Sequence, residues 1–353
     1  MGNTAKKELS WINTLKAGCI LLVVLYHTVL PGFSDTVIHL TAGFLPAKLW
    51  VVFNNTLSPL RMPAFFFVSG LLATNGIMNR PWNIVLTSRV TNLFYLYFLW
   101  GIIQWLMINR VSGPLMGGYL SHNINAAWAD SFGESIKLMI LAMSSSWYLY
   151  ALGLFFLFTK LLRHHALKLV MAAVLMNYAA LTGLLPGWGA ESLFQYFIFF
   201  LLGTFHSATI MQWSEWRQRN LVVWSVLIAL SLLHIVLGMS KSLWLCILAI
   251  IISIRICCWL NERINMNAIN WIGRNTLQIY VIHRIFIEFF ALTAILFADR
   301  YHLFSSHFFS WVWAIFFPVV MVALSSACSL LSFGVLNRGI GRLLFIYPRL
   351  LRP

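Results

Sequence analysis

Residues 15–27 read LKAGCILLVVLYH and place a lysine and a histidine in the first long apolar run of the chain. Charged and titratable side chains are costly in membrane hydrocarbon, where by default they mark functional sites. Lys16 and His27 are eleven residues apart, so a helix carries them on nearly the same face, separated by about 16 Å along its axis. Such a helix can hold an anion near the membrane edge and handle a proton deeper inside. Alternatively, Lys16 is a helix-end cation that reaches the interface and His27 is a hydrogen-bonded packing residue.

The composition of the 353-residue chain predicts an all-α polytopic membrane protein. Hydrophobic residues make up 60% of it and charged residues only 9%, whereas soluble domains carry about 25% charged residues. The formal net charge is +15, but the basic residues form short clusters between apolar runs. This pattern is typical of cytoplasmic loops, so we expect a lipid bilayer and no nucleic acid as a partner. The five cysteines lie in or beside apolar stretches without metal-binding spacing, so we expect neither a disulfide framework nor a metal site.

About ten transmembrane helices are predicted from the apolar runs. The first is expected to be retained, because no small-x-small cleavage site of a signal peptide follows it. We place the helices at roughly 14–33, 49–76, 91–109, 138–162, 167–185, 193–210, 221–239, 242–260, 275–297 and 310–335. No internal repeat or linker divides the sequence, and the two halves do not mirror each other in hydropathy, which argues against a transporter built from inverted repeats. We therefore expect residues 1–353 to form a single domain.

The distribution of basic residues predicts the orientation of the helices. Of the 24 Lys and Arg residues, seventeen fall on one set of helix ends, six on the other set, and Arg284 lies within a helix. Basic residues favour the cytoplasmic side, so the N- and C-termini are both predicted to be cytoplasmic. Residues 110–136 are then outside, and their glycine, aromatic and polar residues predict either a re-entrant or interfacial cover over a site or a plain loop.

Polar residues in the second and third predicted helices have two interpretations each. Arg61 stands between two prolines in SPLRMPAFFFVSGLLA (58–73), where it either bonds to backbone carbonyls freed by proline or faces a polar cavity. Ser69 precedes a glycine that allows a ligand, or simply another helix, to approach the backbone. Arg89 opens the third helix and is either a topology signal or a ligand-binding cation.

The ninth predicted helix carries the second constellation, in NTLQIYVIHRIFIEFF (275–290). Arg284 and Glu288 are four residues apart, so they share a face and can pair. His283 is turned about 140° around the helix from Glu288. The three residues form either a functional cluster or a structural pair with a capping histidine. At the fourth helix, Trp147 and Tyr148 occupy a place where interfacial anchors are also expected.

Five segments, taken in chain order, resemble motifs of the acyltransferase-3 family of bacterial integral membrane O-acyltransferases. Lys16 to His27 is similar to the family's Arg-x10-His first helix, and RMPAFFFVSGLL (61–72) resembles its FFxxSG segment. The three other matching segments are SSWYLYALGLFF (145–156), LFQYFIFFLLGTF (193–205) and IGRNTLQIYVIH (272–283). The RMP version of the second segment looks most like the branch that contains the glucan succinyltransferases.

The resemblance implies a reaction. Family members take an acyl group from acyl-CoA, here acetyl-CoA or succinyl-CoA, on the cytoplasmic side of the bacterial inner membrane and transfer it to a hydroxyl of an envelope carbohydrate. His27 matches the family's essential histidine. Lys16 stands where the family has arginine, and lysine lacks the bidentate fork that suits phosphates. Arg89 matches the first arginine of an RxxR-L-x-P stretch in which Asn92 and Tyr95 replace the second arginine and the proline.

The end of the sequence bears on the partners that the resemblance implies. The chain ends in RLLFIYPRLLRP (342–353) just after the last predicted helix, so we expect no fused extracytoplasmic hydrolase-like domain. Transfer then finishes either within the membrane domain or on a separate extracytoplasmic partner. A homo-oligomer is a further possibility.

Acyl transfer from a thioester to a hydroxyl requires a base or a nucleophile, together with positive groups for phosphates and for the developing oxyanion. We predict that His27 is the base or a transient acyl carrier, that Arg61 steadies the oxyanion or the sugar, and that His283 is a further catalytic candidate. The residues predicted to bind the acyl-CoA donor are Lys16, Arg89, Ser69 and Trp147. Two other classes stay open, namely a transporter or flippase for an ionic or glycan substrate and a non-catalytic assembly subunit.

Overall fold

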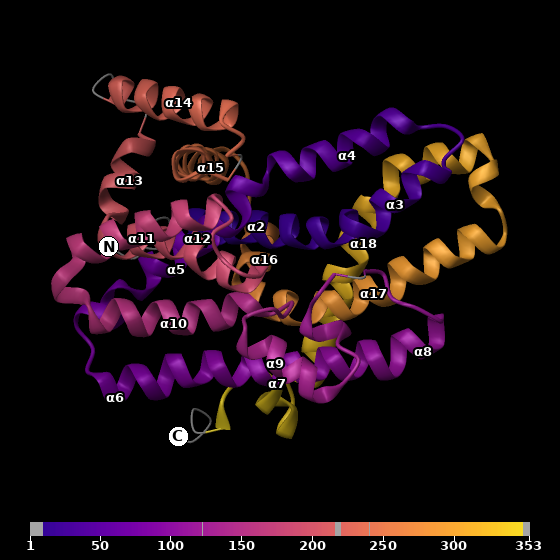
Figure 1. The fold of residues 1–353 in the computed structure, drawn as a ribbon, viewed down its shortest axis with the longest axis horizontal. Helices are drawn as coiled ribbons and strands as arrows, with labels where there is room; N and C mark the ends of the chain where they lie inside the picture. The colour runs from indigo at the N-terminus through magenta and orange to yellow at the C-terminus, as the bar shows by residue number, and fades with distance from the viewer. Residues whose placement is uncertain (1–9, 122, 216–219, 240, 349–353) are drawn as a thin grey trace. The chain divides into compact units, whose positions relative to one another are not determined.

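The protein is all-α (Figure 1). The computed structural model describes residues 10–121, 123–215, 220–239 and 241–348, and these ranges contain helices and no strand, which confirms the predicted fold class. The helices of eight residues or more are α2 (Ser10–Thr28), α4 (Phe44–Thr56), α5 (Ser58–Met78), α7 (Thr91–Met107), α9 (Phe132–Ile140), α10 (Trp147–Leu161), α11 (Ala166–Leu181), α12 (Trp188–Phe205), α13 (Ser207–Ser214), α14 (Leu221–Val236), α15 (Leu243–Arg263), α16 (Asn267–Arg274), α17 (Thr276–Arg300) and α18 (His307–Leu336).

Several of these helices are long and apolar enough to cross a membrane. Within the described part of the chain, six helical stretches meet this condition: Ser10–His39, Phe44–Met78, Trp82–Met116, Leu243–Arg263, Thr276–Arg300 and His307–Leu336. The pair α12 and α13, bent by 86°, is a seventh if it counts as one span. The protein is therefore polytopic. The predicted count of ten is higher because α10, α11 and α14 are apolar but only 15 or 16 residues long, or about 22 to 24 Å, against a hydrocarbon core of about 30 Å.

Several of the predicted helices are interrupted in the structure. The helix expected at 138–162 is broken between α9 and α10, where Ala142 has a φ of +60°, a left-handed conformation that ends an α-helix. The helix expected at 49–76 begins earlier, at Phe44, and is interrupted at Leu57. Pro59, two residues after Leu57, lacks the N–H that a helix interior requires. A new helix therefore begins at Ser58.

The chain divides into two compact units, each assembled from three stretches. Unit 1 comprises Met1–Cys19, Ser58–Phe94 and Tyr148–Thr276, and unit 2 comprises Ile20–Leu57, Tyr95–Trp147 and Leu277–Pro353. Helix α2 contributes its first part to unit 1 and its last part, from Ile20, to unit 2.

In unit 1 the helices α5 and α12 lie side by side (Figure 1) and pack closely. Two glycines allow this approach. A Cβ atom at Gly70 would collide with the carbonyl oxygen of Phe200, and one at Gly203 would collide with that of Phe67. Small residues let membrane helices bring their backbones together, because the helices gain packing contacts where lipid provides no hydrophobic drive. The crossing holds the middle of α5, including the candidate residue Ser69, in place.

In unit 2 the helix α17 is fastened by side chains from other segments. The Gln104 side chain on α7 donates a hydrogen bond of 2.8 Å from Nε2 to the Val281 carbonyl oxygen. The Tyr280 hydroxyl donates one of 3.1 Å to the carbonyl oxygen of Ser145, in the break that precedes α10. These bonds fix the part of α17 that carries His283.

The segment predicted to be a cover or a loop, residues 110–136, is held against its own unit in its described parts, 110–121 and 123–136. It contains the short helices α8 (Gly113–Met116) and η5 (Ala126–Trp128) and the start of α9. Trp105 on α7 donates a hydrogen bond of 2.8 Å from Nε1 to the Ala129 carbonyl oxygen, and Asn109 donates one of 2.6 Å to the carbonyl oxygen of Ala127. The segment therefore has a defined conformation.

Candidate active site

Two histidines from different helices are neighbours in unit 2. His27, near the end of α2, and His283, on α17, have ring centroids 5.4 Å apart. His283 is only 1% exposed, and its Nδ1 is 2.9 Å from the Ile279 carbonyl oxygen. Because a carbonyl oxygen only accepts hydrogen bonds, Nδ1 carries the hydrogen, so neutral His283 has its lone pair on Nε2. The structure therefore brings two of the three predicted catalytic candidates together.

A buried ion pair follows His283 on the same helix. Nη2 of Arg284 and Oε2 of Glu288 are 3.5 Å apart, and both side chains are buried, as their four-residue spacing predicts. The other carboxylate oxygen, Oε1, accepts a hydrogen bond of 2.6 Å from the backbone N–H of Leu120. The Arg284 guanidinium lies 4.6 Å from the centre of the Trp128 ring. Residues of the segment after α7 thus contact α17 at the ion pair.

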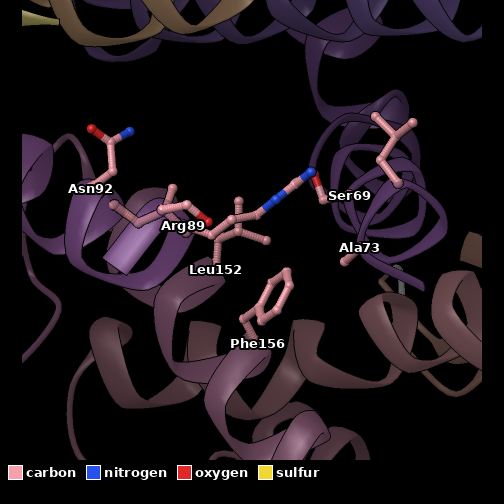
Figure 2. A pocket seen from close by; sticks show the side chains of 9 residues that line it. Ser69, Ala73, Arg89, Asn92, Leu152 and Phe156 are labelled. Atoms are coloured by element: carbon pink, nitrogen blue, oxygen red, sulfur yellow. The ribbon is translucent and has the colours of Figure 1, made fainter. Parts of the chain in front are cut away.

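Unit 1 contains a cavity lined by two of the predicted donor-binding residues. Its volume is about 320 Å³. Ser69 of α5 and Arg89 of the short π-helix η3 (Leu86–Val90) both line it. Figure 2 shows the Arg89 side chain extending across the cavity toward Ser69. The remaining lining residues are Leu72, Ala73, Ser88, Asn92, Leu93, Leu152 and Phe156. A guanidinium and several small polar groups therefore face an otherwise apolar pocket.

Ser69 has a partner in Tyr148, which the sequence predicts only as an interfacial aromatic. Its hydroxyl lies 2.5 Å from the hydroxyl of Tyr148, at the start of α10. The Tyr148 ring packs against Phe65 and Phe66 of α5, at centroid distances of 5.7 Å and 4.8 Å. Tyr148 therefore holds the Ser69 hydroxyl in a defined position at the wall of the cavity. The sequence signal for Tyr148 is its position beside Trp147, in a segment that resembles a family motif.

The other predicted site residues are divided between the two units. Lys16, half-buried on α2, and Arg61, buried on α5, belong to unit 1 together with Ser69 and Arg89. Trp147, half-buried at the first position of α10, belongs to unit 2 together with the two histidines. In the part of the chain that the structure describes, no group of three or more His, Cys, Asp or Glu side chains is placed to hold a metal ion.

The chain is similar to known proteins over most of its length. A family model described as an acyltransferase domain matches residues 9–330. The chain belongs to the acyltransferase-3 family. It is 35% identical over 299 residues to the inner membrane protein YcfT of Escherichia coli strain K12, and the match covers 82% of each chain. No solved structure matches it. This protein is therefore a membrane acyltransferase, and its reaction joins an acyl donor to an acceptor.

Proposed function

We propose that this acyltransferase moves an acetyl or succinyl group from cytoplasmic acyl-CoA to a hydroxyl of an envelope carbohydrate in the bacterial inner membrane. The observation that carries the proposal is the pairing of His27, in the family-like first helix, with buried His283. A histidine near a second imidazole with a free lone pair has the groups needed to accept and hold a proton. The inner-membrane location is supported by the similarity to YcfT.

His27 has two possible roles in the reaction, and the bonds and protons balance in both. As a general base it takes the proton of the acceptor hydroxyl, whose oxygen attacks the thioester carbonyl carbon, after which the C–S bond breaks and the thiolate takes up the proton. As a nucleophile its ring nitrogen first attacks that carbon and expels the thiolate; the acceptor oxygen then displaces the imidazole, and the acceptor's hydroxyl proton passes to the thiolate. In either route His283 Nε2 is available to accept a hydrogen bond from a protonated neighbour, because its own hydrogen is committed to Ile279.

The donor is proposed to enter the cavity of unit 1. A volume of about 320 Å³ is at the lower end of the range for sites of drug-sized ligands, so the cavity suits one portion of coenzyme A and not the whole molecule. The Arg89 guanidinium suits a phosphate, which it can bind through two parallel hydrogen bonds. The hydroxyls of Ser69 and Ser88 and the amide of Asn92 suit the polar groups of the pantetheine arm. Lys16 is proposed as a second cation for the donor.

Replacing Arg89 by methionine is expected to weaken binding of coenzyme A by about 1.5 to 3 kcal/mol, the contribution of hydrogen bonds to a charged group. Arg89→Lys keeps the charge but loses the fork, so its loss is expected to be smaller. Binding of coenzyme A to purified protein over a range of salt concentrations measures both effects. Lys168→Met is a matched control, because Lys168 is an exposed cation outside the cavity. Equal affinities in wild type and Arg89→Met would assign the donor to another site.

Lys16 is tested in the same assay. Lys16→Met is expected to weaken coenzyme A binding by about 1 to 3 kcal/mol, whereas Lys16→Arg keeps or strengthens it through the guanidinium fork. Unchanged affinity in correctly inserted Lys16→Met protein would make Lys16 an ordinary helix-end cation.

Both termini are proposed to be cytoplasmic, on the basis of the asymmetry in basic residues. A reporter fused after Pro353 is therefore expected to be active only if it functions in the cytoplasm. Activity of a reporter that works only in the periplasm would contradict this orientation.

The proposed reaction is tested most simply with the protein reconstituted in sealed vesicles. Labelled acyl-CoA is supplied on the face that carries the termini, and envelope glycan is supplied on the opposite face. We expect the label to appear on the glycan as an alkali-labile ester. No label on the glycan, with acyl-CoA intact, would contradict the proposal.

A further inference from the structure

The ion pair on α17 lies among polar atoms that have no hydrogen-bond partner in the described part of the chain. None of the three guanidinium nitrogens of Arg284 makes a hydrogen bond there, and neither does Oε2 of Glu288 or Nε1 of Trp128. All five atoms are buried, and the two charged side chains are almost wholly inaccessible. Buried polar atoms in native proteins nearly always have partners, so a concentration of unsatisfied ones at one place requires an explanation.

The unsatisfied atoms include both hydrogen-bond donors and a hydrogen-bond acceptor. Arg284 and Trp128 offer N–H donors, and Glu288 offers a carboxylate oxygen as an acceptor. The pair has no net charge, so an anion would be repelled by Glu288 and a cation by Arg284. A hydroxyl both donates and accepts, and it therefore matches the mixed set. An indole ring beside such groups adds an apolar surface for the C–H face of a sugar.

We propose that Arg284, Glu288 and Trp128 bind hydroxyls of the neutral acceptor carbohydrate, an inference that rests on the proposed function. Arg284 follows His283 directly on α17, and His283 lies 5.4 Å from His27 by ring centroids. A sugar bound at the ion pair is thus held on α17 beside His283, whose ring is the neighbour of the candidate base His27.

The segment from Gly113 to Trp128 belongs to this acceptor site. Its backbone N–H at Leu120 engages Oε1 of Glu288 and leaves Oε2 available to the ligand. Its Trp128 ring lies 4.6 Å from the Arg284 guanidinium, which it stabilises by a cation–π contact. The segment therefore shapes the acceptor site as well as fastening it, and its residues set which sugar is accepted.

The test measures binding of envelope glycan and of coenzyme A to the same purified full-length protein. The probe is the neutral oligosaccharide fraction released from envelopes of cells that lack the protein. Trp128→Phe removes the indole N–H and keeps an aromatic ring, and it is expected to weaken glycan binding about tenfold. The double variant Arg284→Gln/Glu288→Gln avoids an unpaired buried charge, and it is expected to weaken glycan binding about a hundredfold. The dissociation constant for coenzyme A is expected to stay within about twofold.

Trp100→Phe is the matched control. Trp100 is a buried tryptophan of the same unit whose indole N–H is already used by the Leu344 carbonyl oxygen, outside the acceptor segment, so its loss is expected to leave glycan affinity unchanged. Wild-type glycan affinity in folded Trp128→Phe and double-variant protein, or absence of glycan binding by the wild type, would overturn the inference and assign the unsatisfied atoms to bound water. Glycan binding that depends on Trp128 without any transfer from acyl-CoA would instead contradict the proposed function alone.

Discussion

His27→Ala protein is expected to insert and fold normally yet to lose acyl transfer by about 10² to 10⁴, the usual contribution of general acid–base catalysis. The loss is larger if His27 carries the acyl group, because no other route then forms the intermediate. His27 is half-buried at the end of α2, so its removal leaves little empty core volume. The ester content of envelope carbohydrate, measured by mass spectrometry in cells that produce the variant as their only copy, reports the loss.

A second buried histidine provides the control for this experiment. His234 on α14 is 8% exposed, and its ring nitrogens contact the Tyr178 hydroxyl and the Leu230 carbonyl oxygen. Both of its nitrogens are therefore used within unit 1. His234→Asn is expected to retain transfer, with at most reduced stability. Near-normal ester content in well-folded His27→Ala cells would make His27 a packing residue.

Gly70→Val is expected to prevent unit 1 from folding. The added Cβ would collide with the carbonyl oxygen of Phe200, which belongs to the backbone of α12 and cannot rotate away as a side chain can. Overpacking in a close-packed core costs about 3 kcal/mol when side chains can adjust, and here the two helices must separate. The amount of monodisperse protein after heating in detergent measures the change. Because Gly70 follows Ser69, any surviving protein is also expected to have a displaced donor cavity.

Gly334→Ala on α18 is the matched substitution, since a Cβ at Gly334 has no atom within 4 Å. Alanine there is expected to be neutral or to stabilise the helix by about 0.5 to 1 kcal/mol. Equal thermal stability of the Gly70→Val and Gly334→Ala proteins would contradict the close crossing of α5 and α12.

Much of the candidate site was predictable from the sequence because membrane segments tolerate few polar residues. His27 and His283 stand out for this reason, and their rings are neighbours in the structure. Arg284 and Glu288 stand out for the same reason, and they form an ion pair. Ser69 and Arg89 were selected with the help of family-like motifs, and both line one cavity.

Other parts of the site were not predictable, because they depend on contacts between distant segments. The Leu120 N–H that binds Glu288 is a backbone group and leaves no mark in the sequence. In the sequence Trp128 is not distinguished from an interfacial aromatic, and only the structure places its ring beside the Arg284 guanidinium. Tyr148 stands at the start of an apolar helix, and only the structure shows that its hydroxyl lies beside that of Ser69.

The fold was predicted in class but not in detail. Apolar composition and length establish α-helices in a membrane, but hydropathy does not register a local change of backbone conformation. The positive φ of Ala142 therefore divided one expected helix into α9 and α10. Hydropathy also does not fix helix length, and apolar helices such as α14, at 16 residues, are shorter than the expected spans.

The central claim is that His27 transfers an acyl group from acyl-CoA to a carbohydrate hydroxyl. It is tested most directly by following free coenzyme A thiol and glycan ester together, in purified wild-type and His27→Ala protein supplied with acyl-CoA and envelope glycan. The wild type is expected to release one thiol for each ester formed, and His27→Ala is expected to form neither above background. Equal thiol release by the two proteins, or glycan ester formed at the wild-type rate without His27, would contradict it.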